Sequence, residues 1–569
     1  MKNSTSRIRL VAVIFVAVAL LFVVRLFFIQ VIRGSDYAEQ ADRQYLRPAN
    51  NIFERGSIFF TTKDGTMVSA ASLKVGFIVA ANPQKITNAS TTYEQLAVML
   101  PDLNREKTIQ QLSDRADPYV EIATRVDQTI ADQIKASKIS GIDIYKQKWR
   151  FYPAGPAAAH AIGFMGYKGD LYSGRYGLEK QYDSLLTRNK DGLFVNFFAE
   201  LFSEFASSTQ NTATGAEGDI VLTIEPLVQN ALEKELTAYV EKWQPDMVAG
   251  IIINPQNGEI YAMAGRPNFD PGEKQTNIEA LNNKMVEKTY EMGSIFKPLT
   301  IAAALDTGVV TASTTYNDKG CLTLNKKKFC NFDGKARGVI PVQEILNQSL
   351  NVGSTFVMQR LGAERFRSYF HAYGFSEKTG IDLPDEASGQ TASLDGKPRE
   401  IDLANMSFGQ GIAITPMEMA RALSVLGNGG RLIRPHLVRQ INHKNLLTET
   451  IPLEPGQQII KPETSAEISR MLTVVVDTKL ADGKVKMAHY RIAAKTGTAQ
   501  IYNLANGGYY DDRNLHSFFG YFPASKPQFL IFLMSVYPKG AAYSSQTLTD
   551  PFISLNRFLI NYYQVPPDR

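Results

Sequence analysis

Ser294-Ile295-Phe296-Lys297 is the stretch on which the interpretation of this 569-residue chain depends. A serine hydroxyl is a poor nucleophile until a neighbouring group takes its proton. If these four residues open a helix, the i to i+3 spacing brings Lys297 onto the same face as Ser294, one turn away. A neutral lysine there can act as the base. The competing interpretation of Ser294 alone is an ordinary helix N-cap.

Two further short motifs follow along the chain. Ser349-Leu350-Asn351 comes first, and Lys495-Thr496-Gly497-Thr498 comes after it. The ordered set Ser-x-x-Lys, Ser-x-Asn and Lys-Thr-Gly is the signature of the penicillin-recognising serine acyltransferases. With all three motifs in order, the N-cap interpretation of Ser294 becomes much weaker.

Two of the motifs occur a second time. Ser554-Leu555-Asn556 lies after Lys495 and breaks the expected order. A second Lys-Thr-Gly begins at Lys378, in a stretch whose composition is typical of a loop. The segment from Arg491 to Thr498 instead has the pattern of a strand that faces a cleft, so Lys495 is the predicted site residue.

The composition limits the number of domains and the kinds of partner that the chain can have. The chain is 44% hydrophobic and 21% charged, which is ample for two or three domains with real cores. A net charge of +5 is mild for this length, and no basic tract stands out, so we expect no nucleic-acid partner. Six histidines are scattered without metal-ligand spacing, so neither a metal site nor a cofactor is expected.

The two cysteines, Cys321 and Cys330, bracket a short lysine-rich segment. They can close a small disulfide loop if this part of the chain lies outside the cytoplasm. Two unlinked thiols are the alternative, because spacing alone does not fix the geometry.

The N-terminal region predicts a membrane anchor. The run from Leu10 to Ile32 is apolar apart from Arg25 and Gln30, and at about 1.5 Å per residue it can span a bilayer core of about 30 Å. No small-residue cleavage site follows, which favours an uncleaved signal-anchor. We expect the short tail to remain inside and the large remainder to lie on the outer face of the cytoplasmic membrane.

Three segments are predicted. Residues 1–34 form the cytoplasmic tail and transmembrane helix, and residues 35–215 form a mixed domain with helical stretches such as Tyr93 to Leu100. A polar run at residues 207–212 is typical of a linker. Residues 216–569 form the second domain.

The second domain opens with strand and helix patterns. Residues 219–225 and 247–253 read as strands, residues 226–239 as a helix, and residues 259–264 as the hairpin partner of the second strand. Strands near both ends with helices between them predict an α+β domain built on one antiparallel sheet flanked by helices.

Beyond the trio, the chain resembles the class B penicillin-binding proteins, the monofunctional peptidoglycan transpeptidases. The resemblance runs nearly end to end, through the single anchor and these stretches: 54–58, 152–163, 176–183, 222–225, 408–411, 415–416 and 516–523. Two positions depart from the family pattern. Thr62-Lys63-Asp64-Gly65 stands where the family has an Asp-Arg-Asn-Gly turn, and Met292 stands where a proline is common.

The resemblance implies a role for each of the first four site residues. Ser294 would attack the carbonyl between the two terminal D-alanines of a stem peptide and hold the acyl group as an ester. Lys297 would be the base, with its pKa lowered by burial and by the charge of Lys495. Ser349 would relay a proton to the leaving nitrogen, while Asn351 would bind the substrate amide or steady Lys297.

The Lys-Thr-Gly strand would bind the substrate. Lys495 would attract the terminal carboxylate, and the Thr496 and Thr498 hydroxyls would bind it directly. The backbone N–H groups of Ser294 and Thr498 would stabilise the oxyanion. We expect glycine at 497 because the strand passes close to the substrate.

The implied function is crosslinking of peptidoglycan stem peptides, with β-lactams as covalent inhibitors. The implied fold is a penicillin-binding transpeptidase domain preceded by an elongated α+β pedestal. Glycan polymerisation would need a membrane glycosyltransferase as partner, together with other division proteins. A β-lactamase or β-lactam sensor, and an inactive wall-synthesis scaffold, are the competing functions; the pedestal and the intact motifs disfavour them.

Within class B, the string from Tyr37 to Tyr45 and the Lys-Thr-Gly-Thr-Ala-Gln500 string look more like the division branch than the elongation branch. We therefore expect a role in septal wall synthesis, with an elongation-type enzyme as the alternative.

Overall fold

The computed structural model describes most of the chain beyond the N-terminal region: residues 20–22, 25, 54–168, 171–188, 217–275, 277–444, 447–503, 505 and 507–569. Apart from residues 20–22 and 25, the predicted membrane span from Leu10 to Ile32 lies outside these residues, as do the string from Tyr37 to Tyr45 and the predicted linker at 207–212. Within the described residues, no helix has the length and apolar character needed to cross a bilayer.

The chain divides into two units. Among the described residues, the first contains residues 20–22, 25 and 75–149, and the second contains residues 54–74, 150–188 and those from 217 to 569. Strands β2 (Met67–Ala81) and β4 (Ile142–Phe151) contribute residues to both.

The first unit is a small α+β layer. Its further elements are η2 (Pro83–Lys85), α3 (Ala89–Ala97), α4 (Arg105–Ser113), β3 (Val120–Val126), α5 (Gln128–Ser137) and β4 (Ile142–Phe151). Asn88 and Asn104 cap α3 and α4 through their side-chain oxygens, which satisfies a backbone N–H group that the first helical turn leaves free. Helices and strands pack around a core that includes Val79 and Leu96.

The N-terminal part of the second unit is organised around a buried carboxylate. Glu179 receives Arg55 Nε at 2.7 Å on one oxygen and Arg150 Nε at 2.6 Å on the other. All three side chains are almost fully buried. Removal of one partner would leave a buried charge uncompensated, which is far more costly than loss of a surface ion pair.

A five-stranded antiparallel sheet forms the centre of the second unit. Its order is β18 (Ala493–Asn503), β19 (Gly508–Phe522), β20 (Phe529–Val536), β8 (Met247–Ile253) and β9 (Ile260–Arg266). The predicted strand at 247–253 and its hairpin partner are confirmed. Strand β18 lies at the edge of the sheet and carries the Lys-Thr-Gly motif.

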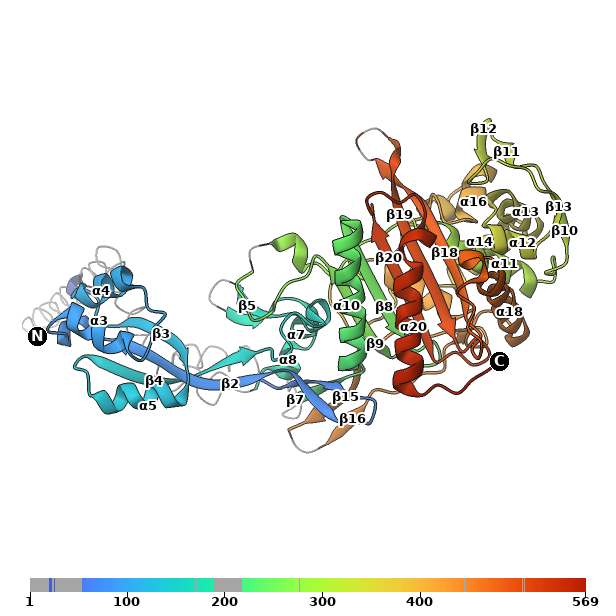
Figure 1. The fold of residues 1–569 in the computed structure, drawn as a ribbon. Coiled ribbons are helices and arrows are strands. Elements are labelled where there is room, and N and C mark those ends of the chain that lie inside the picture. Colours follow the sequence, from blue (N-terminus) through green and yellow to red (C-terminus); the bar gives the residue numbers. More distant parts are fainter. Residues whose placement is uncertain are drawn as a thin grey trace, which may run out of the picture. The chain divides into compact units, whose positions relative to one another are not determined.

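Helices cover both faces of this sheet. On one face α10 (Pro226–Trp243) and α20 (Thr549–Tyr563) lie side by side (Figure 1), and their apolar side chains pack on residues such as Phe518. On the other face α11 (Lys297–Asp306) and α18 (Pro462–Thr478) pack on residues such as Phe519. Because successive strand residues point to opposite faces, Lys495 lies on the α11 side while Thr496 and Thr498 lie on the α20 side.

The remaining elements of the second unit are short strands outside this five-stranded sheet, and further helices. The short strands are β1 (Ile58–Thr61), β5 (Met165–Lys168), β6 (Leu171–Gly174), β7 (Gly218–Leu222), β10 (Thr315–Asp318), β11 (Cys321–Leu324), β12 (Lys327–Cys330), β13 (Gly338–Pro341), β14 (Arg431–Leu432), β15 (Val438–His443), β16 (Thr448–Thr450) and β17 (Gln457–Gln458). The helices are α6 (Ala159–Ile162), α7 (Gly177–Gln181), α8 (Asp183–Leu186), η3 (Ile278–Leu281), η4 (Gly293–Phe296), α12 (Gln343–Gln348), α13 (Asn351–Leu361), α14 (Ala363–Ala372), α15 (Ala392–Asp395), α16 (Glu400–Met406), α17 (Pro416–Ser424), η5 (Leu480–Gly483) and α19 (Ser544–Thr547).

The unusual stretch Thr62-Lys63-Asp64-Gly65 forms the turn between β1 and β2. The Gly65 N–H donates to Thr62 O at 2.9 Å, and the Asp64 carboxylate accepts the Thr66 N–H at 3.2 Å. The antiparallel pairing of β1 with β2 is therefore retained despite the departure from the family pattern.

Candidate active site

Ser294 and Lys297 lie together at the junction of two helical segments. Ser294 is in the 3-10 turn η4, and Lys297 is the first residue of α11. The Lys297 Nζ atom is 2.9 Å from Ser294 Oγ. The predicted helical placement is confirmed, with the tighter 3-10 geometry at the serine itself.

The Lys297 side chain is fully buried. Besides Ser294, its Nζ contacts Ser349 O at 2.6 Å, Asn351 Oδ1 at 2.8 Å and Ser349 Oγ at 3.3 Å. Burial, and secondarily the charge of Lys495, hold the pKa of Lys297 well below its ordinary value. The charged form of Lys297 is disfavoured because none of these contacts is with a carboxylate that could pair with a cation.

Ser349 is the first of the two residues between α12 and α13. Its backbone is left-handed, with φ of 56° and ψ of 45°, a conformation that costs a non-glycine residue about 1 to 3 kcal/mol. This conformation points both its carbonyl oxygen and its hydroxyl at Lys297. Ser349 of the Ser-x-Asn motif thus provides two contacts to Lys297, one through its carbonyl oxygen and one through its hydroxyl.

Asn351 follows as the first residue of α13. Its Oδ1 accepts from Lys297, and its Nδ2 donates to the backbone oxygen of Cys330 at 2.9 Å. Of the two roles expected for Asn351, the contact with Lys297 is the one that this structure contains.

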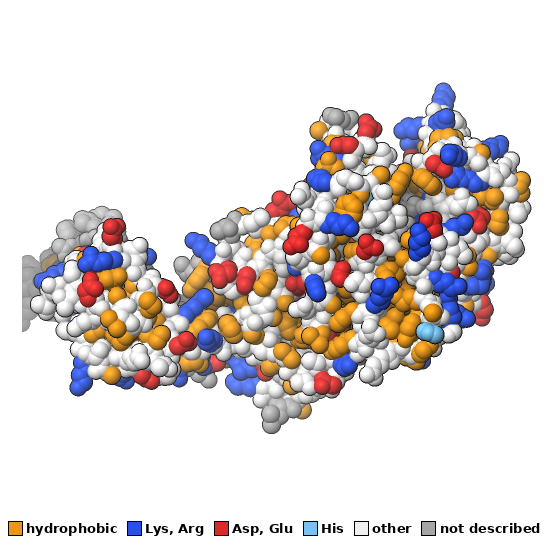
Figure 2. All heavy atoms as spheres, viewed as in Figure 1, with side chains coloured by type: hydrophobic (Ala, Val, Ile, Leu, Met, Phe, Trp, Pro, Cys, Tyr) orange, Lys and Arg blue, Asp and Glu red, His pale blue; other side chains and the backbone are white. Residues whose placement is uncertain are grey.

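Cys330 is joined to Cys321 by a disulfide. The two residues are directly opposite each other in the hairpin of β11 and β12. Exposed lysines 326–328 lie at the turn of this hairpin, where basic side chains gather in Figure 2. The contact of Cys330 with Asn351 connects the hairpin to the site, a connection that no sequence motif indicated.

Lys495 enters the site from the edge strand β18. Its Nζ donates to Ser349 Oγ at 3.0 Å and to Thr496 O at 2.9 Å. Burial lowers the pKa of Lys495 to about 7. Ser349 Oγ therefore lies between two lysines, and the three motifs meet at this hydroxyl.

Thr498 and Gly497 bring β18 against the nucleophile turn. Gly293 has a φ of 64°, and a Cβ there would lie 2.6 Å from Thr498 O. At Gly497, a Cβ would clash with Ser517 Oγ and lie 2.8 Å from Met292 O. Close approach to the protein's own nucleophile turn is therefore one physical reason for glycine at 497, and the expected approach of the strand to the substrate stays a prediction.

The Met292 departure is accommodated in the same place. Met292 is fully buried, and its carbonyl oxygen accepts a hydrogen bond from Ser517 Oγ at 2.7 Å. This bond connects the residue before Gly293 and Ser294 to strand β19, so the turn that carries the nucleophile is held without the common proline.

Two groups at the site were not selected from the sequence as site residues. The Phe408 ring lies 6.0 Å from Lys297 Nζ, and Phe408 belongs to the Phe-Gly-Gln-Gly string that carried only the family resemblance. The Ser544 N–H donates to Thr498 Oγ1 at 3.1 Å. A backbone donor of this kind leaves no trace in a sequence motif.

The second Lys-Thr-Gly lies outside any helix or strand, as predicted. Thr379 is buried and bonded to the Glu386 carboxylate, while Lys378 is exposed. His516 is fully buried with its Nδ1 2.9 Å from Thr547 Oγ1. Within the part of the chain that the structure describes, no cluster of three His, Cys, Asp or Glu side chains could hold a metal ion.

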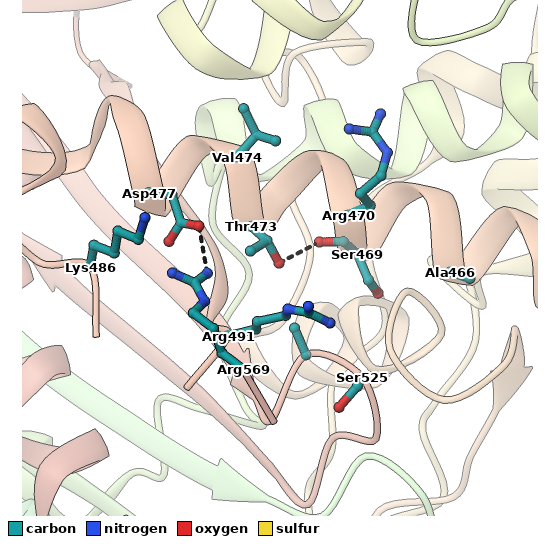
Figure 3. A pocket seen from close by; sticks show the side chains of 11 residues that line it. Ala466, Ser469, Arg470, Thr473, Val474, Asp477, Lys486, Arg491, Ser525 and Arg569 are labelled. Carbon is teal, nitrogen blue, oxygen red and sulfur yellow. Dashed lines mark hydrogen bonds and ion pairs between the residues drawn. The ribbon is translucent and has the colours of Figure 1, made fainter. Parts of the chain in front are cut away.

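A cavity of about 590 Å³ lies apart from these groups. Figure 3 shows it between α18, the segment before β18 and the C-terminal residue, with Arg491 and Arg569 projecting into it. Arg569 forms an ion pair there with Asp477. No predicted site residue lines this cavity, so the cavity is separate from the candidate active site.

Comparison with known proteins identifies both parts of the chain. Residues 248–554 match the penicillin binding protein transpeptidase domain, and residues 54–195 match the penicillin-binding protein dimerisation domain. Stage V sporulation protein D of Bacillus subtilis is 30% identical over 97% of this chain and 85% of its own length. The probable peptidoglycan D,D-transpeptidase FtsI of Caulobacter vibrioides is 28% identical over 82% of this chain and 74% of its own length.

Solved structures show the same fold. Penicillin binding protein 2X from Streptococcus thermophilus matches with a TM-score of 0.71 and 20% identity, over 90% of this chain and 81% of that one. Penicillin binding protein 3 from Mycobacterium tuberculosis, in complex with aztreonam, matches with a TM-score of 0.65 and 23% identity, over 74% of this chain and 92% of that one. The α+β fold, the two matched domains and the full-length relatives together show that the chain belongs to the class B penicillin-binding proteins, a family of serine transpeptidases.

Proposed function

We propose that the protein is a peptidoglycan D,D-transpeptidase that crosslinks stem peptides through an acyl-enzyme on Ser294. The observation that carries this proposal is the contact of Ser294 Oγ with a fully buried lysine amine at 2.9 Å. The names of relatives such as the FtsI protein of Caulobacter vibrioides support the substrate class.

Counting hydrogen bonds indicates how Lys297 acts as the base. A neutral amine has two N–H donors and one lone pair. Ser349 O and Asn351 Oδ1 are pure acceptors and lie at 2.6 and 2.8 Å, so they take the two donors. The lone pair is then left for the Ser294 hydroxyl, which is the orientation that proton removal requires.

The acylation step follows from this arrangement. Ser294 Oγ attacks the carbonyl carbon between the two D-alanines while its proton passes to Lys297. The backbone N–H groups of Ser294 and Thr498 stabilise the oxyanion. The C–N bond then breaks, a proton reaches the nitrogen, and D-alanine leaves with the acyl group held as an ester on Ser294.

Ser349 is suited to deliver that proton. Its Oγ accepts from Lys495 Nζ at 3.0 Å and lies 3.3 Å from Lys297 Nζ, so its own proton can pass to the leaving nitrogen and be replaced from Lys297. In the second half-reaction an amine of a neighbouring stem attacks the ester, forms the new amide and returns the Ser294 hydroxyl.

Lys495, Thr496, Gly497 and Thr498 form the proposed substrate strand. The two threonine hydroxyls bind the terminal carboxylate directly, the charge of Lys495 attracts it from the other face of the edge strand, and the backbone at Gly497 lies along the same edge. Because β18 has a free edge, the stem peptide can pair with it as an added strand.

The setting in the cell is part of the proposal. We infer a single anchor at residues 1–34, a pedestal at residues 35–215 and a transpeptidase domain at residues 216–569 on the outer face of the cytoplasmic membrane. A membrane glycosyltransferase and other division proteins are the proposed partners. Septal synthesis is the proposed role, on the strings at residues 37–45 and 495–500.

Labelling of the full-length protein in detergent by fluorescent penicillin tests the central proposal. We expect a long-lived adduct that peptide mapping places on Ser294, and its loss in Ser294→Ala. Lys297→Ala should slow labelling by several orders of magnitude, because the hydroxyl would keep its proton. Ser554→Ala, in the second Ser-x-Asn copy, is the matched control and should label normally.

The same experiment separates the other functions. Rapid release of the label would indicate a β-lactamase. Failure of the folded protein to label would indicate an inactive scaffold and would contradict the proposal.

A further inference from the structure

The Thr498 hydroxyl has a defined direction before any ligand binds. Its Oγ1 accepts the Ser544 N–H at 3.1 Å. No acceptor within the described residues takes the Thr498 hydroxyl proton in exchange, and the side chain is half-buried at the edge of the site. A hydroxyl that accepts on one side keeps its single proton for a partner on another. The Thr498 hydroxyl is therefore oriented to donate a hydrogen bond to a ligand.

Two hydrogen bonds hold Ser544 in place, and a third connects Thr547 to His516. Ser544 Oγ donates to Ser517 O at 2.6 Å, and Thr547 Oγ1 donates to Ser544 O at 3.4 Å. Thr547 Oγ1 also lies 2.9 Å from His516 Nδ1. Thr547 Oγ1 therefore connects the imidazole of His516 to the backbone oxygen of Ser544.

The position of His516 connects this chain of bonds to the site. His516 is directly opposite Thr498 in the antiparallel pairing of β18 and β19, so both side chains point to the same face of the sheet. The imidazole is fully buried, and burial lowers its pKa to about 4. It is neutral near pH 7, so it orients its neighbours without adding a charge beside the substrate.

We propose that His516 and Thr547 are positioning residues that hold the Ser544 N–H on Thr498, so that the Thr498 hydroxyl donates to the carboxylate of the substrate or β-lactam. This inference rests on the proposed function. Neither residue touches the substrate; each acts through Ser544. A purely structural role in packing α19 on the sheet is the competing explanation.

Two probes that differ only at the carboxylate distinguish these explanations. The second-order rate of acylation of the full-length protein is measured with benzylpenicillin and with its methyl ester. Thr547→Val removes one hydroxyl with little change of shape. We expect it to lower the rate with benzylpenicillin about tenfold, the effect of one charge-assisted hydrogen bond, and to leave the ester rate within about twofold.

Variants of His516 add a second measurement. His516→Leu removes the ring nitrogen that bonds to Thr547 and should behave as Thr547→Val does. His516→Asn places an amide group, which can donate or accept a hydrogen bond, near the position of Nδ1 and should recover most of the rate with benzylpenicillin. Thermal unfolding of each variant reports on folding, and Thr547→Val carries the test if His516→Leu does not fold.

A double-mutant cycle completes the test. In a Thr498→Val background, Thr547→Val should cause no further loss with benzylpenicillin, because the hydroxyl that it orients is gone. Equal losses with both probes, no loss with either, or an additive loss in the cycle would overturn the inference. A wild-type protein that is not acylated on Ser294 would instead overturn the proposed function.

Discussion

Lys297 Nζ lies 2.6 Å from the backbone oxygen of Ser349, and Ser349 holds a left-handed backbone with φ of 56° to present that oxygen. Strain of this kind persists where the surrounding contacts over-determine it. Here the same conformation also places Ser349 Oγ within 3.0 Å of Lys495 Nζ. The strained backbone of Ser349 therefore occurs in the same conformation that brings Lys297 and Lys495 to the Ser349 hydroxyl.

Substitutions at Ser349 separate strain from chemistry. Ser349→Gly removes the hydroxyl and relieves the backbone, whereas Ser349→Ala removes the hydroxyl and retains the strain. Both should lower penicillin acylation strongly, while the glycine variant should be about 1 kcal/mol more stable than the alanine variant. Chemical denaturation measures the difference, and equal stabilities would show that the left-handed backbone carries no cost.

The two Lys-Thr-Gly strings give a matched pair of variants. Lys495→Ala should lower acylation sharply, because it removes the cation beside Ser349 and the carboxylate site. Lys378 is exposed and far along the chain from the edge strand, so Lys378→Ala should leave acylation within a few fold. A damaging Lys378→Ala would mean that β18 is not the substrate strand.

The two lysines also predict the pH dependence of acylation. Lys297 must be neutral, so the rate should rise as pH rises through its lowered pKa. Lys495 must be charged, so the rate should fall as pH rises through its pKa of about 7. The bell-shaped profile belongs to the coupled pair and is measured with benzylpenicillin over a wide pH range.

Removal of Lys495 should change this profile in a definite way. Its charge is one of the causes of the lowered pKa of Lys297, so in Lys495→Ala the pKa of Lys297 should rise. The acid limb should move to higher pH and the alkaline limb should disappear. An acid limb that stays in place would show that burial alone lowers the pKa of Lys297.

Much of this site could be predicted from the sequence because its groups sit in short motifs. Ser294 with Lys297, and Ser349 with Asn351, are near in sequence, and their order matches a known set. The strand at 247–253 was predictable because it is continuously apolar and buried. These signals are local, so they survive without knowledge of the tertiary structure.

Groups that act through the backbone could not be predicted in this way. The Cys330 carbonyl that holds Asn351 and the Ser544 N–H on Thr498 are peptide groups that every residue offers. The contact of Gly497 with Met292 could not be predicted either, because the two residues are more than two hundred positions apart in the chain. Long-range packing of this kind has no periodicity to detect.

The predicted anchor has its own test. A reporter that works only outside the cytoplasm, fused after Arg569, should be active, because the apolar run from Leu10 to Ile32 is expected to span the membrane. The intact chain should stay with membranes after a high-salt wash. Activity of a reporter that works only in the cytoplasm would contradict this topology.

Gly497→Ala tests whether the glycine serves the protein or the substrate. An added Cβ would clash with Ser517 Oγ and press on Met292 O, so the turn that carries Ser294 should shift. A displacement near 1 Å at a nucleophile can cost about 100-fold in rate, and overpacking should lower stability by about 1 to 3 kcal/mol. Penicillin acylation and chemical denaturation measure the two effects.

Gly508→Ala is the matched control. Gly508 begins β19, the partner strand of β18, and a Cβ there would meet no atom within 4 Å. Acylation and stability of this variant should remain close to those of the wild type. If Gly497→Ala instead kept its stability and lost affinity only for a peptide substrate, then approach of the strand to the substrate would be the reason for this glycine, and the contact with Met292 would be incidental.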